Sequence, residues 1–159
     1  MKERCPICGE ESDLQFLPYN IPHFGDAIMF VAVCPSCGYR STDVRILSEN
    51  KAKQRRYELV VSSVQDLNVR VIRSTFGRIE IPELGVTVDP KEGDSFISTV
   101  EGVLKRVERV VKMLNRDAVG DKKKRAEQTL VKIEEIKAGK ASMTLILEDP
   151  TGNSAIIPD

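Results

Sequence analysis

The chain has 159 residues, of which 24 are Lys or Arg and 24 are Asp or Glu, so its formal net charge at pH 7 is zero. Hydrophobic residues make up 41% of the sequence, with one His, no Trp and four Cys. This composition is ordinary for a globular protein and excludes an intrinsically disordered chain. The length suits one domain with a small appendage rather than two full-size domains.

No stretch of the sequence predicts a membrane span or a secretory signal. The longest uninterrupted apolar run, Ala27 to Cys34, is far shorter than the roughly 20 residues that cross a bilayer. The N-terminal residues also lack the apolar core of a signal peptide. We therefore expect a cytoplasmic protein with no membrane partner, in a compartment that keeps cysteines reduced.

All four cysteines lie in two copies of the pattern C-P-x-C-G, at residues 5–9 and 34–38. A tight turn in each copy can present two sulfurs to one metal ion, and the Gly that follows can take the positive φ of such a turn. Two such turns complete a tetrahedron of thiolates with no open position for water. The spacing therefore predicts that one structural Zn²⁺ ion is bound by Cys5, Cys8, Cys34 and Cys37.

Other uses of these cysteines are less favoured. A reducing compartment disfavours disulfides, and a redox C-x-x-C site needs one motif rather than a matched pair. Tetrahedral sulfur coordination also accepts iron, as in rubredoxin, but nothing in the remaining sequence indicates electron transfer. The only His, His23, lies in a turn between the motifs, and we expect it to be structural because four thiolates already satisfy the ion.

Residues 1–47 are expected to form a zinc ribbon with a long hairpin. Leu14 and Phe16 alternate with polar residues, and residues 27–33 form a short apolar run, both of which are typical of strands. Turn-forming residues at 20–26 separate the two strands. The polar residues 48–56 are expected to be a linker to the rest of the chain.

Residues 57–159 are expected to form a β-rich, barrel-like domain with an inserted pair of helices, which makes the whole chain α+β and mainly β. Short runs rich in β-branched residues are separated by Gly and Pro turns, which favours an antiparallel meander or a small barrel. The final strands follow the helices, so the sheet is expected to need the last residues of the sequence. The predicted strands are 57–61, 69–72, 78–81, 86–88, 143–147 and 156–157.

An antiparallel helical hairpin is expected over about residues 98–138. Ser98 to Glu101 matches a capping box, and Gly102 suggests that another backbone approaches the first turn of the helix. The second helix, residues 122–137, begins with the basic run Lys122 to Arg125, for which a solvated hairpin tip is favoured over a phosphate site. The apolar stripes are Val100, Val103, Leu104, Val107, Val110, Val111 and Leu114 on the first helix and Ala126, Leu130, Ile133 and Ile136 on the second.

Three blocks of the sequence together resemble the ZPR-type zinc-finger family. The first contains both C-P-x-C-G motifs, with Asn20 to Gly25 between them and Tyr39, Arg40, Asp43 and Val44 after them. The second joins Ile79 to Leu84 with Ser98 to Leu104, and the third runs from Leu145 to Ser154. The blocks occur in order over nearly the whole chain, and their combination is specific.

The resemblance implies one four-cysteine zinc finger followed by a domain similar to a double-stranded β-helix with a helical hairpin. It also implies a binding protein without catalytic residues, whose ligands are Cys5, Cys8, Cys34 and Cys37. The family partner is the elongation-factor GTPase that delivers aminoacyl-tRNA, which members bind and help to mature; growth-factor receptor tails are a further reported partner. Eukaryotic members carry two modules and this chain carries one, so self-association could replace the second.

Two other classes of function compete with an elongation-factor adaptor. The two C-P-x-C-G turns and the basic stretch 98–140 suggest a zinc-ribbon nucleic-acid-binding protein of transcription or translation. The zero net charge of the chain and its few aromatic residues weigh against this class. An enzyme would have to use Asp149, Asn153 and Ser154, and no base, nucleophile or phosphate loop accompanies them. We therefore expect a non-enzymatic protein-binding module whose docking surface the sequence does not identify.

Overall fold

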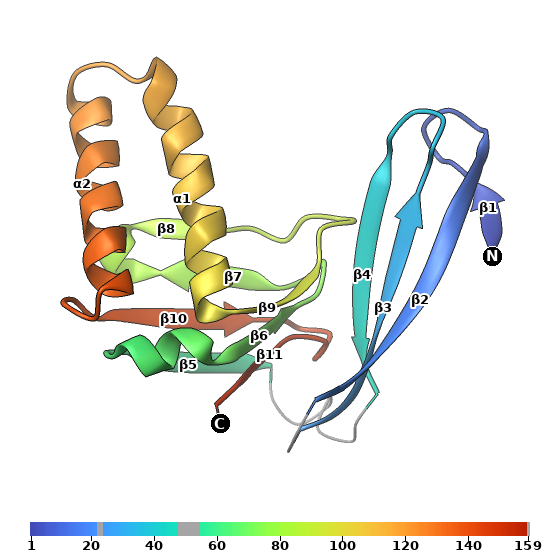
Figure 1. The fold of residues 1–159 in the computed structure, drawn as a ribbon, viewed down its shortest axis with the longest axis horizontal. Coiled ribbons are helices and arrows are strands. Elements are labelled where there is room, and N and C mark those ends of the chain that lie inside the picture. The colour runs from blue at the N-terminus through green and yellow to red at the C-terminus, as the bar shows by residue number, and fades with distance from the viewer. Residues whose placement is uncertain (22–23, 48–54, 159) are drawn as a thin grey trace.

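Two arms rise from a common β-sheet base (Figure 1). The computed structural model describes residues 1–21, 24–47 and 55–158. One arm is the N-terminal ribbon, which carries the cysteines, and the other is a pair of helices. His23, predicted to be structural, and residues 48–54 of the predicted linker lie outside the described residues.

The ribbon is a four-stranded antiparallel sheet in the order β1-β2-β3-β4. The two predicted strands are present, and both extend into the predicted turn, because Asn20 pairs with Asp26 and Ile21 with Gly25. The outer two strands were not predicted from the sequence. The strands are β1 Lys2–Arg4, β2 Glu11–Ile21, β3 Gly25–Val33 and β4 Arg40–Ile46.

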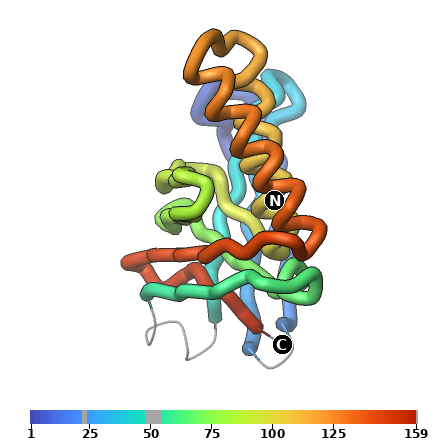
Figure 2. The backbone as a smooth tube through the Cα atoms, turned by 90° about the vertical axis from the view of Figure 1, so that its left-hand side faces the viewer, coloured from blue at the N-terminus to red at the C-terminus, as the bar shows by residue number. Residues whose placement is uncertain are grey.

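The remaining strands form two sheets, in the orders β5-β10-β7-β8 and β11-β6-β9. These orders exclude the predicted antiparallel meander, because β10 lies between β5 and β7, and Figure 2 shows β10 and β5 running side by side. The last strands complete both sheets, as expected. The strands are β5 Arg56–Val61, β6 Arg70–Arg73, β7 Arg78–Ile81, β8 Val86–Val88, β9 Phe96–Thr99, β10 Met143–Glu148 and β11 Ala155–Ile157.

The main hydrophobic core lies between these two sheets and the helices. Apolar residues from both sheets contribute to it, together with Leu67 of the short 3-10 helix Val64–Asn68 and Leu84 of the 3-10 helix Pro82–Leu84. Burying this apolar surface is the dominant favourable contribution to folding. Its fully buried members include Val71, Ile79, Ile81, Val100, Leu104, Ile133, Met143, Leu145 and Leu147.

The helices are α1 Val100–Asp117 and α2 Asp121–Lys137, close to the predicted bounds. The predicted capping box is wrong by one residue: Ser98 pairs with Val71 inside β9, and the Thr99 hydroxyl accepts the Gly102 N–H at 3.2 Å. The predicted close approach of another backbone to Gly102 is wrong as well. The Ser98 side chain approaches instead, because a Cβ at Gly102 would lie 1.9 Å from the Ser98 hydroxyl oxygen.

A second, smaller core joins the ribbon to the base. Ile21 of β2, Ala27 of β3 and Ile46 of β4 pack against Ile72 and Ala155 of the three-stranded sheet. Near the N-terminal end of β4, the Thr42 hydroxyl donates to the Ser95 carbonyl at 2.8 Å and accepts the Ser95 N–H at 2.9 Å. Apolar packing and hydrogen bonds together hold the ribbon at a defined angle to the base.

An ion pair joins the two helices. The Lys137 ammonium of α2 lies 2.6 Å from a carboxylate oxygen of Glu108 on α1, and the Lys112 ammonium lies 3.1 Å from the other oxygen. These hydrogen bonds lower the pKa of Glu108 to about 2. The folded hairpin is therefore more stable when Glu108 is charged.

Replacing Glu108 with Gln should lower the free energy of unfolding by about 1 kcal/mol or less, because the lost pair is only half-buried. The wild-type advantage should be complete above the ordinary Glu pKa of about 4.3 and fade as the pH falls towards about 2. Urea unfolding of the wild-type and Glu108→Gln proteins between pH 2 and pH 7 measures this difference in the free energy of unfolding. Glu101→Gln, which removes a pair within α1 alone, is the matched control; equal losses in both variants would contradict a role in joining the helices.

Candidate metal centre

Two turns of nearly identical conformation present the four cysteines. In the first turn the Gly9 N–H donates to the Cys5 carbonyl at 3.0 Å, and in the second the Gly38 N–H donates to the Cys34 carbonyl at 2.8 Å. Both glycines have the positive φ that the sequence pattern required, 79° and 80°. The turns lie at the far end of the ribbon, away from the base.

The four sulfurs converge on one point. All lie within 4.8 Å of one another, with 3.7 Å between the Sγ atoms of Cys5 and Cys37 and 3.6 Å between those of Cys8 and Cys34. A tetrahedral zinc with Zn–S bonds of about 2.3 Å places its sulfurs about 3.8 Å apart. The donor set therefore fits one Zn²⁺ ion.

The electrostatics of this cluster favour a bound cation. The backbone N–H of Cys8 contributes most to a lowered pKa for the Cys5 thiol, about 7. The pKa of Cys37 is raised to about 12, because burial and the neighbouring sulfurs outweigh the hydrogen bond from the Tyr39 amide. Zinc binds thiolates and not thiols, so binding of the ion releases the remaining thiol protons and weakens as the pH falls.

The residues considered for catalysis lie in a buried turn instead. Asp149, Asn153 and Ser154 are 2%, 3% and 1% exposed. The Asp149 carboxylate accepts the Ser74 and Ser154 hydroxyls, each at 2.5 Å, and the Thr151 hydroxyl at 2.6 Å. These hydrogen bonds lock the turn that joins β10 to β11, so the three polar residues have a structural explanation.

Asp149 keeps its charge despite being buried. Burial alone would raise the pKa of its carboxyl, but the hydrogen bonds from Ser154, Ser74 and Thr151 favour the charged form and lower that pKa overall. A carboxylate with a lowered pKa stabilises the fold above its ordinary pKa and loses that contribution as the pH falls. The turn thus stabilises the fold at neutral pH.

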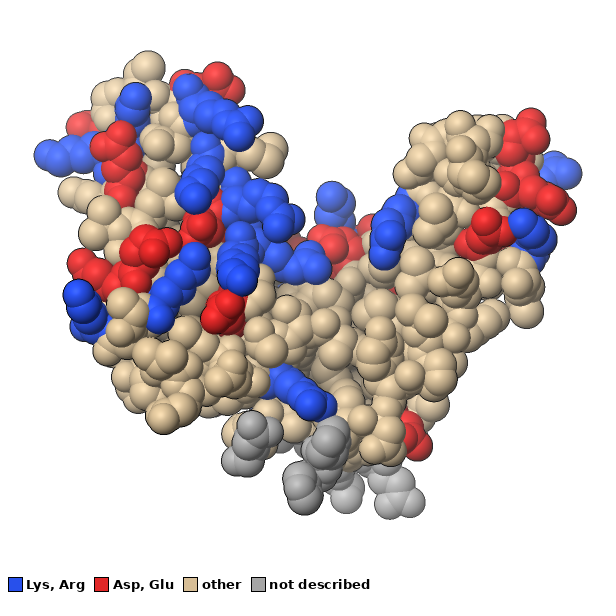
Figure 3. Space-filling model, in the orientation of Figure 1, with Lys and Arg blue, Asp and Glu red and all other residues tan. Residues whose placement is uncertain are grey.

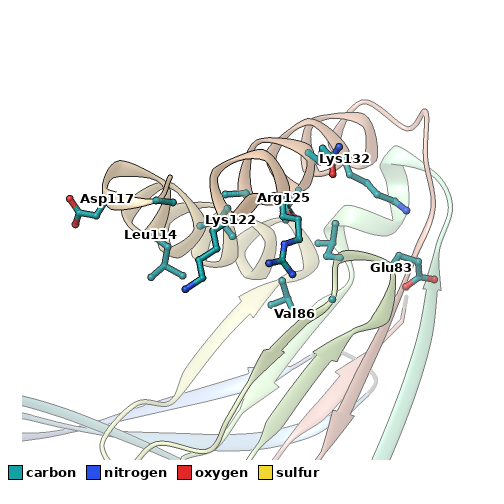
Figure 4. Close-up of a pocket in the computed structure, with 14 residues that line it drawn as sticks. Glu83, Val86, Leu114, Asp117, Lys122, Arg125 and Lys132 are labelled. Atoms are coloured by element: carbon teal, nitrogen blue, oxygen red, sulfur yellow. Dashed lines mark hydrogen bonds between the residues drawn. The ribbon is translucent and has the colours of Figure 1, made fainter. Parts of the chain in front are cut away.

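The basic run at the start of α2 divides into two parts. Lys122 and Arg125 line a cavity between the helices and the β8 end of the base, with Lys132 further along the same helix (Figure 4). Lys123 and Lys124 are exposed and do not line it. All four residues are exposed, as the predicted solvated tip requires, and two of them also border the cavity.

Two family models match the ribbon and the two-sheet part of the chain separately. The sequence model of the ZPR1 zinc-finger domain matches residues 1–51, and that of the ZPR1 jelly-roll domain matches residues 65–159. The chain belongs to the ZPR1 family. It carries one domain of each kind, and the two facing sheets are the jelly-roll, or double-stranded β-helix, that the resemblance implied.

Relatives in two archaea match most of their own length. An uncharacterised ZPR1-like protein of Pyrococcus horikoshii is 40% identical over 164 residues, covering 96% of this chain and 71% of the relative. One of Methanocaldococcus jannaschii is 41% identical over 157 residues, covering 96% and 78%. The zinc finger chaperone zpr1 of Schizosaccharomyces pombe is 31% identical over 155 residues, covering 94% of this chain and only 34% of the relative.

The ZPR1 chain thus combines a zinc site with a two-sheet domain typical of its family. In the part of the chain that the structure describes, no helix is long and apolar enough to span a membrane. Of these three relatives, the fission yeast protein is named as a zinc finger chaperone. The family therefore supports a zinc-binding module that interacts with proteins.

Replacing Asp149 with Asn should destabilise the jelly-roll domain by about 2 to 3 kcal/mol, because hydrogen bonds to a charged acceptor are stronger than those to a neutral one. The loss should shrink in acid, where the wild-type carboxyl also becomes neutral. Urea unfolding at pH 7 and pH 3 measures both effects. Asp117→Asn, at the exposed end of α1, is the control; an equally small effect for both would contradict a structural role.

Replacing Cys8 with Ser should abolish stoichiometric zinc binding and unfold the ribbon. Structural zinc contributes about 10 to 16 kcal/mol in small fingers, comparable with the stability of about 5 to 15 kcal/mol of a whole domain. The main core contains no ribbon residue, so the jelly-roll domain should stay folded. Metal analysis and circular dichroism check both results. The control, Ser36→Ala in the second turn, should retain one zinc; a folded ribbon with bound zinc in Cys8→Ser would contradict the site.

Proposed function

We propose that this ZPR1 chain is a non-enzymatic module that binds, and helps to fold or hold, the translation elongation-factor GTPase that delivers aminoacyl-tRNA. Exposed apolar side chains on the helical arm are the observation that carries a protein-binding role. Val110, Met113 and Leu114 of α1 are 54%, 58% and 68% exposed. Neighbouring apolar side chains left in water typically mark a surface that binds another protein.

The zinc site supports this role by shaping the second arm. We assign Cys5, Cys8, Cys34 and Cys37 as the four ligands of one structural ion, because a closed tetrahedron of thiolates leaves no position for a substrate. Residues 1–47 then act as a ribbon unit and residues 57–159 as the β-rich unit; of the predicted linker 48–56, Arg56 already belongs to β5. The ion holds the far end of the ribbon together while its near end packs on the base.

The choice of an elongation factor rests on family resemblance. The three sequence blocks span both arms and the base, and the fission yeast relative bears the name of a zinc finger chaperone. Such a client is a cytoplasmic protein, so we assign the chain to the cytoplasm. A non-enzymatic role agrees with the burial of Asp149, Asn153 and Ser154 in a structural turn.

Calorimetric titration with the cognate elongation factor, in its GDP-bound and nucleotide-free forms, tests the proposal. We expect saturable binding at equal stoichiometry, stronger for the nucleotide-free form, because a chaperone prefers the less ordered client. The Cys8→Ser protein should bind more weakly because one arm is lost. Absence of binding in both forms of the factor would disprove this assignment.

A nucleic-acid partner is the second candidate, and the distribution of charge favours it. Lys and Arg gather on the α1 side of the helical arm and beside the hollow between the two arms (Figure 3). Phosphate contacts release counterions, so such binding would weaken steeply as salt rises. Binding of single-stranded RNA that survives physiological salt would favour this alternative over the elongation factor.

A further inference from the structure

The apolar stripe of α1 continues beyond the sheet that it covers. Val103 and Val107 are buried in the main core, whereas Val110 and Leu114 further along the stripe are exposed. Seven helical residues from Val107 to Leu114 span roughly 10 Å. Neighbouring strands lie about 4.8 Å apart, so the overhanging part of α1 is long enough to cover one or two more strands.

The sheet ends beneath this overhang at an unpaired edge. β8 is the last strand of the order β5-β10-β7-β8, and among the described residues only β7 pairs with it. Val86 and Val88 are half-buried towards the core, and Thr87 is exposed. The free edge therefore offers backbone N–H and C=O groups to another extended chain.

A continuous groove runs along this edge. One cavity of about 800 Å³ lies between β8 and the inner side of the two helices, as Figure 4 shows around Val86, Leu114 and Arg125. A second cavity of about 570 Å³ lies between β8 and α1. The two cavities share Gly85, Val86, Val111 and Leu114, so they form one groove with an apolar wall.

Positive charge lies at both ends of the groove. Lys122, Arg125 and Lys132 line one end, and Arg106 and Arg109 line the other. None of the five forms an ion pair with the described part of the chain; the Arg106 guanidinium lies over the Phe96 ring at 4.3 Å. Arg109, Lys122 and Arg125 are therefore available to a negatively charged ligand, whereas the charge of Lys132 also acts on the Glu83 carboxylate and lowers its pKa.

The acidic residues of the groove are mostly engaged elsewhere. The Glu83 carboxylate accepts the Thr144 N–H at 2.8 Å and its hydroxyl at 2.9 Å. Asp94 pairs with the buried Arg73 guanidinium at 3.5 Å, and Asp89 pairs with Arg78 at 3.7 Å. Only Asp117, at the end of α1, remains without a described partner, so the groove attracts acidic rather than basic segments.

We propose that the β8 edge and the overhanging helices bind an extended protein segment, which pairs with β8 as an added strand, turns apolar side chains at every second central position towards the helices and carries acidic side chains at its two ends. The apolar side chains lie against Val110, Val111 and Leu114, and the acidic ones reach the Lys and Arg side chains at the two ends. The inference rests on the proposed protein-binding function, for which it names the docking edge and the partner's chemistry. Main-chain hydrogen bonds provide affinity in this mode, and the side-chain pattern provides specificity.

Selection from a displayed library of random decapeptides on the full zinc-loaded chain tests the proposal. We expect enrichment of peptides with Val, Ile or Phe at every second central position and Asp or Glu towards both ends. The strongest peptide is then labelled and titrated by fluorescence anisotropy, and β8 amides should gain protection from hydrogen exchange when it binds. No enrichment, or enrichment of basic or patternless peptides, would overturn the proposal.

Two pairs of matched variants locate the binding site. Leu114→Ser and Arg125→Glu should each weaken peptide binding at least about tenfold. Val131→Ser and Lys123→Glu change exposed residues of the same helical hairpin that do not line the groove, so these variants should bind as the wild type does. All four positions are exposed, so the fold should survive each change. Equal effects in both pairs would overturn the assignment of the groove.

The same variants separate this inference from the proposed elongation factor. If the factor binds the wild type and the Leu114→Ser chain equally, the factor remains a partner and the groove is not its docking site. If peptides bind and the factor does not, the groove stands and the client is another protein. A dimer that Leu114→Ser abolishes, without peptide binding to the monomer, would assign the groove to a second copy of the chain and overturn the proposal.

Discussion

The pairing of β10 with both β5 and β7 is the interaction on which the rest of the molecule depends. Met143, Leu145 and Leu147 of this strand are fully buried and face the core that also receives the helices. The strand leads into the Asp149 turn, which returns the chain as β11 to the other sheet. One stretch near the end of the sequence therefore joins both sheets, supports the helical arm and forms part of the surface on which the ribbon rests.

Both arms pack on the same pair of sheets, so the fold fixes the distance between them. The ribbon is held by Ile46 and its apolar neighbours, and the helices by the stripe that continues into the main core. The zinc ion acts at one extremity and leaves the base to its own hydrophobic packing. A partner would thus meet two surfaces at a preset spacing, with the apolar and basic helical arm facing one side of the hollow (Figure 3).

Features encoded by local sequence were predictable, and features that require distant residues to meet were not. The paired C-P-x-C-G turns determine the metal cluster by themselves, and the three-and-four spacing from Val100 to Leu114 determines α1. Strand β9 was missed because Ser98 reads as a helix cap until its pairing with Val71 is known. The strand order was unpredictable because β10 joins partners far away in sequence. Likewise, Lys122 and Arg125 become groove residues only because α2 lies over the β8 edge.

The hydrogen bond from the Ile46 N–H to the Asn153 side-chain oxygen, at 3.2 Å, links the end of the ribbon to one of the last turns of the chain. During synthesis the ribbon leaves the ribosome first, and its four cysteines can capture zinc while β10 and β11 do not yet exist. The contacts of that ribbon with Asn153 and Ala155 form only after this last part of the chain is made. The metal cluster and the two-armed shape therefore depend on different stretches of the chain, the first on residues 5–37 alone and the second also on the turn at Asn153.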